Sequence, residues 1–230
     1  MANGNSADLF GSIISDFMAV IMKPADFFRN MPKEGGYVQP LIFMVAMALA
    51  TAIVMAVIGM LGFGSAGMMA MGFMGIVVIP IMAAIFGFVG AAVLFVIWKI
   101  MGSEENYETA YRCTAYSYAY APVAALFNVV PYLGAIIGAV WPMALFALAS
   151  MNVHGRSKNA SWAVFGVLGA ILAIIAVGGE KTGRYMQESA GNWQQQIEQG
   201  LQPDGEEMSP EEAGKAVGDF LKGLQDSQQK

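Results

Sequence analysis

The chain is 230 residues long, and 57% of its residues are hydrophobic while only 13% are charged. A soluble domain usually carries about 25% charged residues, so the composition excludes an ordinary water-soluble globule. The formal net charge is −5 and basic residues form no cluster, so no nucleic-acid partner is expected.

Residues 1–34 are predicted to form an amphipathic N-terminal segment. The stretch 7–22 is too short and too charged to cross a bilayer, so we expect either an interfacial helix or a helix packed on the protein's own spans. A short second helix after Pro24 is expected to turn Phe27, Phe28 and Met31 toward the membrane. The first helix is predicted from apolar residues at helical spacing: Leu9, Phe10, Ile13, Ile14, Phe17 and Ile21.

Residues 35–177 are predicted to form a five-helix transmembrane bundle, so the fold class is an all-α integral membrane protein. No charge lies between Glu34 and Lys99, and a bilayer requires about 20 consecutive apolar residues. The expected spans cover residues 38–61, 72–100, 108–130, 131–151 and 162–177. Small-residue pairs, Gly134 with Gly138 and Gly166 with Ala170, predict close helix contacts within the bundle or between copies.

Basic residues are expected to set the orientation of the bundle. Seven Lys and Arg residues fall in segments on the N-terminal side and two on the other, which predicts a cytoplasmic N-terminus and a C-terminus on the opposite side. The tail, residues 178–230, is polar and acidic. It is expected to be loosely ordered, with short helices at about 181–200 and 210–224.

Polar groups occur on two faces of the predicted third span, because Tyr107, Tyr111, Thr114 and Tyr118 follow one helical stripe and Tyr116 and Tyr120 lie opposite. Hydroxyl groups in hydrocarbon need partners, so both faces should contact other helices or a wet cavity. Hydrogen bonding between helices is the favoured interpretation, and a substrate cavity lined by Tyr111, Thr114 and Tyr118 is the alternative. The candidate functional face comprises Tyr107, Tyr111, Arg112, Thr114, Tyr116, Tyr118, Tyr120 and Pro122.

The sequence predicts that the protein is not an enzyme and holds no cofactor or metal, since it lacks the usual catalytic motifs. A nucleophilic pair of Cys113 and His154, or acylation of Cys113, is an alternative, but no third residue that would orient the pair is evident. The methionine cluster Met68, Met69, Met71 and Met74 could bind Cu(I), but methionine is frequent throughout this chain, which has 18.

Several motifs resemble the Yip domain family, named for its interaction with Ypt/Rab GTPases. They are Lys-Pro-Ala-Asp-Phe-Phe-Arg-Asn-Met-Pro at 23–32, Tyr-Val-Gln-Pro-Leu at 37–41, Tyr-Glu-Thr-Ala at 107–110, Tyr-Ser-Tyr-Ala-Tyr-Ala-Pro at 116–122, then Trp141, His154 and Ala163. The resemblance spans about residues 20–175 and implies a helical bundle with a cytoplasmic N-terminus. The N-terminal segment is short, and the acidic aromatic motif that eukaryotic members carry at the first span is not evident. The chain therefore looks more like the bacterial branch, which implies a cell membrane such as the bacterial inner membrane and no Rab role.

The leading hypothesis is a non-enzymatic, multi-pass membrane protein that organises the bilayer or binds partners. Those partners would be lipids, another protein, or a second copy in a homo-oligomer. The alternative is a transporter or channel-like protein for a lipid or small solute, with its cavity beside the tyrosine-rich third span.

Overall fold

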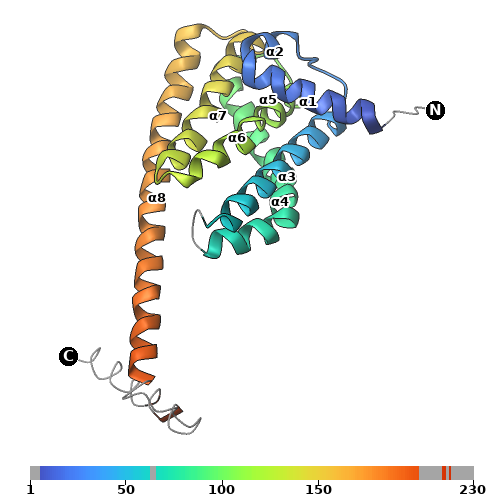
Figure 1. Ribbon diagram of the computed structural model, residues 1–230. Coiled ribbons are helices and arrows are strands. Elements are labelled where there is room, and N and C mark those ends of the chain that lie inside the picture. Colours follow the sequence, from blue (N-terminus) through green and yellow to red (C-terminus); the bar gives the residue numbers. More distant parts are fainter. Residues whose placement is uncertain (1–5, 63–65, 202–213, 216–217, 219–230) are drawn as a thin grey trace. The chain divides into compact units, whose positions relative to one another are not determined.

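The computed structural model describes the backbone of residues 6–62, 66–201, 214–215 and 218, and the side chains of residues 10–62, 74–192, 214–215 and 218. All regular elements of these residues are helices (Figure 1). Four of the helices, α3, α4, α7 and α8, are long and apolar enough to cross a membrane. The helices are α1 (Ser6–Met22), α2 (Pro24–Asn30), α3 (Val38–Met60), α4 (Ala66–Ile100), α5 (Tyr107–Ser117), α6 (Tyr120–Leu126), the 3-10 turn η1 (Phe127–Val129), α7 (Leu133–Asn152) and α8 (Lys158–Leu201).

The predicted third span, residues 108–130, is not one continuous helix. It is built from α5, with 11 residues, and α6, with 7 residues, separated at Tyr118 and Ala119. Pro122 has no N–H to donate to the carbonyl four residues earlier, at Tyr118, and that carbonyl instead accepts from Ala121 N–H at 3.0 Å. The backbone is therefore tightened to a three-residue hydrogen-bond spacing at this point. This explains why a segment with span-like hydropathy does not form one continuous α-helix.

The chain divides into two compact units, Met1–Val177 and Gly178–Lys230. In the second unit α8 continues without a break to Leu201, so the helix predicted at 181–200 is not a separate element. Its described side chains are almost all exposed, and Arg184 pairs with Glu180 one turn away at 2.6 Å. The helix predicted at 210–224 lies largely outside the described residues.

The short helix α2 contributes to the core of the first unit instead of facing the membrane. Phe28 is 1% exposed and Met31 is 6% exposed, and both belong to the core cluster. Phe27 is partly buried, with its ring 5.1 Å from that of Tyr116 on α5. The expectation that Phe27, Phe28 and Met31 face the membrane is therefore wrong, because α2 packs on α7 and these rings fill the space beside α5.

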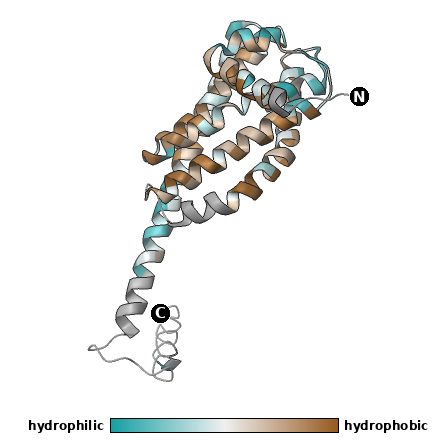
Figure 2. Ribbon diagram, turned by 45° about the vertical axis from the view of Figure 1, so that its right-hand side comes forward, coloured by the Kyte–Doolittle hydropathy of each residue, from teal (hydrophilic) through white to brown (hydrophobic). Residues whose placement is uncertain are grey.

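Hydrophobic residues predominate along the described parts of α3 and α4, and hydrophilic residues gather toward the end of the first unit that holds α2 and the loop before α3 (Figure 2). An apolar surface of this extent suits contact with lipid, since a soluble protein does not expose large contiguous apolar patches. The exposed side chains include Ile42, Leu49, Ile53, Val57 and Met60 on α3, and Val77, Ile81, Ile85, Val89, Val93 and Val96 on α4.

The glycines of the two predicted small-residue pairs have different environments. A Cβ atom at Gly134 would lie 2.8 Å from the Cα of Asn128, so this glycine permits the tight turn between α6 and α7. Gly138 and Gly166 have open space at the same position. The helix α8 approaches α7 through Gly169, where a Cβ would lie 3.2 Å from that of Met143. The close contact of α8 is therefore made on a different face from the one that the pair Gly166 and Ala170 predicted.

Candidate functional site

Arg112 on α5 holds the loop between α2 and α3 against the bundle. Its side chain is 2% exposed, Nε donates to the Pro32 carbonyl at 2.7 Å, and Nη1 donates to the Gly36 carbonyl at 2.9 Å. Glu108 accepts a hydrogen bond from Gly36 N–H at 2.6 Å, and its carboxylate lies 3.9 Å from Nη1 of Arg112. Gly36 has a φ of 82°, which side-chain-bearing residues rarely adopt. The buried guanidinium therefore donates to carbonyls of this loop and does not extend to water.

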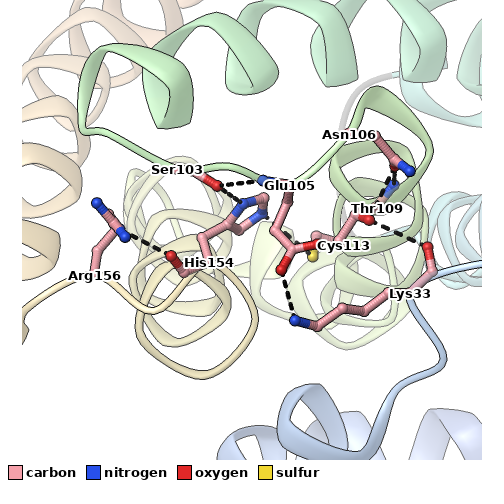
Figure 3. A network of polar contacts seen from close by, with 8 residues as sticks. All are labelled: Lys33, Ser103, Glu105, Asn106, Thr109, Cys113, His154 and Arg156. Carbon is pink, nitrogen blue, oxygen red and sulfur yellow. Dashed lines mark hydrogen bonds and ion pairs between the residues drawn. The ribbon is translucent and has the colours of Figure 1, made fainter.

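A second set of polar contacts joins the start of α5 to the same loop (Figure 3). The side chain of Asn106 caps α5 by accepting from Thr109 N–H at 2.9 Å. The Thr109 hydroxyl lies 3.2 Å from the Lys33 carbonyl, to which it donates, and Lys33 Nζ lies 2.6 Å from the Glu105 carboxylate. These contacts bring residues more than 70 positions apart in the sequence to one end of the bundle.

His154, in the loop between α7 and α8, lies at the centre of the same end of the bundle (Figure 3). Its Nδ1 is 2.8 Å from Ser103 Oγ, and its Nε2 is 3.9 Å from Cys113 Sγ. The imidazole stacks on Trp98 of α4, with ring centres 3.9 Å apart and planes at 19°. One side chain thus contacts α4, α5 and the loop that connects them.

The environment keeps His154 neutral. Burial is the largest cause, and the charges of Lys33, Arg156 and Lys99 add to it, lowering the pKa of His154 from 6.5 to about 3. Cys113 is completely buried, so a substrate cannot reach its sulfur in this arrangement. Ser103 is a third polar group beside Cys113 and His154, which the sequence did not reveal. Because the three side chains are buried, their contacts hold the helix ends together and do not form an accessible site.

The tyrosines of α5 contact protein on both faces. Tyr107 donates to the Phe88 carbonyl on α4 at 2.8 Å, and the Tyr111 ring stacks on Phe88 at 4.3 Å. Tyr116 lies on the other side, against Phe27 of α2. The Tyr111 hydroxyl is buried and has no hydrogen-bond partner in the part of the chain that the structure describes.

A cavity of about 320 Å³ lies between α4, the α5–α6 segment, α7 and α8. Thr114, Tyr118 and Tyr120 line it, whereas Tyr111 does not. The candidate face therefore separates into two places. Thr114, Tyr118 and Tyr120 lie at the cavity, while Tyr107, Tyr111, Arg112 and Tyr116 pack against other elements, and Pro122 is buried in α6.

Ser103, Asn106 and the cavity-lining Gly90 were not predicted from the sequence, and Gly138 was predicted only as a helix-packing residue. Asn106 had a usable signal, because an asparagine directly before a helix is a preferred N-cap. Ser103 and Gly90 had none, since their roles depend on contacts between distant elements. Among the described residues no group of three His, Cys, Asp or Glu side chains could hold a metal ion. The side chains of Met68, Met69 and Met71 lie outside the described residues, and Met74 is exposed.

The comparison with protein families gives one result for this chain. The family model of the Yip1 domain matches residues 18–178, which include α2 to α7 and α8 as far as residue 178. Neither the curated proteins nor the solved structures contain a match. The matched region covers well over half of the sequence and contains three of the four helices of membrane-spanning length, α3, α4 and α7, together with the first part of α8. The chain therefore belongs to the Yip1 domain family and is a membrane-embedded, multi-pass protein.

Proposed function

We propose that this protein organises the bilayer on its N-terminal side through α1, without catalysing a reaction. The observation that carries the proposal is that α1 has two apolar faces. Ile13, Phe17 and Val20 pack in the core of the first unit. Phe10, Ile14, Met18 and Met22 form an outward stripe with one residue per turn, and their exposures are 65%, 48%, 46% and 68%.

The inner face of α1 keeps the outer stripe in place. Val20 is completely buried, and α1 contacts α2 and α5, whose loops carry most of the polar contacts at this end of the bundle. The helix therefore lies where the apolar surface of the bundle gives way to polar loops. An amphipathic helix at that level buries its apolar side chains about 5–10 Å into the boundary between headgroups and acyl chains.

The consequence is an insertion into one leaflet only. Because the bundle already anchors α1, the helix does not have to bind the membrane on its own, and its side chains displace lipid at a fixed position. Such a wedge would space the lipids of that leaflet and provide a surface that also binds a protein partner or a second copy. The absence of the acidic aromatic motif before α3 supports placement in the bacterial branch, and hence in a bacterial inner membrane.

The depth of the stripe can be measured directly. Spin labels at Ile14→Cys and Ser15→Cys compare an apolar exposed position with a neighbouring polar one, and the buried Cys113 stays unlabelled. In proteoliposomes we expect greater oxygen accessibility and lower aqueous nickel accessibility at position 14 than at position 15. Equal water exposure at the two positions would contradict an interfacial α1.

The effect on the bilayer requires a variant that keeps the fold. Removing residues 1–31 would delete Val20, Phe28 and Met31 from the core, so it cannot separate function from stability. The triple variant Phe10→Ser, Ile14→Ser and Met18→Ser changes only exposed side chains. We expect it to abolish any change in vesicle size or curvature that the parent protein causes, with Ser15→Ala as the control. Identical vesicles from the parent and the triple variant would reject the proposal.

The cavity favours a second candidate, passage of a lipid between leaflets along the broken α5–α6 segment. Broken helices beside a central cavity are common in transporters. Liposomes containing a fluorescent phospholipid, with dithionite added outside, would show complete quenching if the protein transfers lipid. Quenching of only the outer leaflet would eliminate this candidate.

A further inference from the structure

We propose that the cavity between α4, the α5–α6 segment, α7 and α8 binds a neutral lipid that carries a hydroxyl or carbonyl oxygen. The site is separate from α1, so this proposal does not depend on the membrane-organising role. Three features support it: glycines line the walls, two tyrosine hydroxyls have no hydrogen-bond partner among the described residues, and the lining carries no charge.

Glycines create the space in the cavity. Gly90 on α4 and Gly138 on α7 both line it, and a Cβ atom at either would meet nothing within 4 Å. Gly87 differs, because a Cβ there would lie 2.6 Å from the sulfur of Met44. Helices normally interdigitate and leave few voids of this size. The volume of about 320 Å³ lies at the lower end of the ~300–1,000 Å³ typical of small-molecule sites.

The polar groups that line the cavity differ in their availability. The hydroxyls of Thr114 and Ser117 donate to carbonyls of their own helix, at 2.9 Å and 2.7 Å, so their hydrogen-bonding needs are met. The hydroxyls of Tyr118 and Tyr120 make no hydrogen bond to the described part of the protein. An apolar cavity with hydroxyl groups that can still donate selects a ligand with an oxygen atom.

The break in the helix brings the two tyrosines to one site. Residues two apart on a regular helix point to nearly opposite sides, so Tyr118 and Tyr120 would normally lie on different faces. Here the backbone tightens between them, both side chains line the cavity, and their ring centres are 6.2 Å apart. Pro122, which causes the break, is therefore part of what builds the site.

The position of the cavity determines that the ligand is neutral and comes from the bilayer. No Lys, Arg, His, Asp or Glu residue lines it, and its α4 and α7 residues lie within helices of membrane-spanning length. A charged group there would be costly, since nothing compensates it. Two apolar side chains that line the cavity, Phe86 and Leu172, are 57% and 39% exposed, which indicates an opening toward lipid.

The test is photolabelling of the full-length protein in nanodiscs, with hexadecanol that carries a diazirine on its chain as the probe. Peptides from α5–α6 and α7 should be labelled in the parent protein. Gly90→Leu and Gly138→Leu fill the cavity without meeting other protein atoms at Cβ, so we expect them to abolish this labelling. Gly166→Leu is the matched control, because Gly166 is equally unobstructed but lies outside the cavity.

The hydroxyl groups are tested separately. Tyr118→Phe and Tyr120→Phe keep the rings, and losing one hydrogen bond should lower labelling by about fivefold for the alcohol probe. Labelling by the matching hydrocarbon, hexadecane with the same diazirine, should not change. Equal loss for both probes would overturn recognition of an oxygen atom.

The site itself would be overturned by unchanged labelling in the two cavity-filling variants, or by the same loss of labelling in Gly166→Leu. Gel filtration of each variant shows whether it is folded. None of these variants alters α1, so failure here leaves the proposed function untouched.

Discussion

Arg112 shows how one buried side chain can determine the path of a loop. Its buried guanidinium donates to two carbonyls from residues 76 and 80 positions away, so a cation that could not make both bonds would be left buried and poorly paired. Lysine cannot reproduce the forked geometry of arginine. We therefore expect Arg112→Lys to lower the free energy of unfolding by about 2–4 kcal/mol, measured by thermal unfolding in detergent. Arg29→Lys is the control, since Arg29 is 62% exposed and its pair with Asp26 should contribute less than about 1 kcal/mol. An equal effect of both changes would contradict the clamp.

His154 predicts a pH dependence with a definite sign. Its pKa in the folded protein is about 3, below the 6.5 of the unfolded chain, so the unfolded state binds more protons between these values. Stability is then greatest above pH 6.5 and falls as the pH drops toward 3. Between pH 7 and pH 5 this group should cost about 2 kcal/mol. His154→Asn keeps an acceptor for Ser103 and does not titrate, so its melting temperature should fall less over that interval. Identical slopes would show that other groups cause the loss.

The two glycines of the GxxxG pair make a matched test of helix packing in α7. Gly134→Ala places a methyl group against the backbone of Asn128, so we expect a loss of about 1–3 kcal/mol despite the better helix propensity of alanine. Gly138→Ala meets nothing within 4 Å and should leave stability unchanged or raise it by up to about 1 kcal/mol. Both values come from thermal unfolding. Equal destabilisation would indicate that Gly138 contacts another copy.

Individual helices were predictable to the extent that hydropathy alone determines them. The boundaries expected for α3, at 38–61, nearly match Val38–Met60, and the start of α7 was displaced by only two residues. The break at Tyr118 and Ala119, before Pro122, was not predictable. Pro80 and Pro142 lie inside α4 and α7, which are continuous, so a proline in the sequence does not reveal which helix will separate. That outcome depends on neighbouring helices that pack on the chain and satisfy its carbonyls.

The candidate site was predictable only where it follows from helical spacing. The two faces of α5 follow from the positions of Tyr107, Tyr111 and Tyr116, and each face does contact protein. The approach of Tyr118 and Tyr120 to one cavity depends on the break and was hidden. The contact of His154 with Ser103 joins residues 51 positions apart, so it is a property of the assembled bundle and not of any local pattern.

At the scale of the first unit, the loops determine which helix ends lie together. The pair Lys33 and Glu105 joins the loop before α3 to the loop before α5, and the contact between Ser103 and His154 adds the loop before α8. The segments α3, α5–α6 and α8 therefore all lead away from this end, while α4 and α7 return to it. The chain crosses the membrane five times if the α5–α6 segment spans it and four times if it does not. Each of these two helices is too short to span alone.

The same end carries the basic residues near the helix termini, including Lys23, Arg29, Lys33, Lys99 and Arg156, and the described turns at 61–62 and 127–132 carry none. The bias of positive charge toward the cytoplasm predicts that this end faces the cytoplasm. Cys113 is fully buried, so the parent protein is an unlabelled background for single cysteines. In intact cells a membrane-impermeant maleimide should label Leu61→Cys, whereas Asn30→Cys should react only after permeabilisation. The reverse pattern would invert the orientation.

A third cysteine decides between four and five crossings. If α5–α6 crosses as a broken segment, Gly178→Cys on α8 will be labelled together with Leu61→Cys in intact cells. If α5–α6 does not cross, α7 leaves the cytoplasmic side and α8 returns to it. Gly178→Cys will then react only after permeabilisation, as Asn30→Cys does. We expect the first result, because the α5–α6 segment contains no charged residue after Arg112 and Pro122 is the only residue in α6 without a backbone donor. A broken but complete crossing is also the arrangement that places Tyr118, Tyr120 and the cavity within the bilayer.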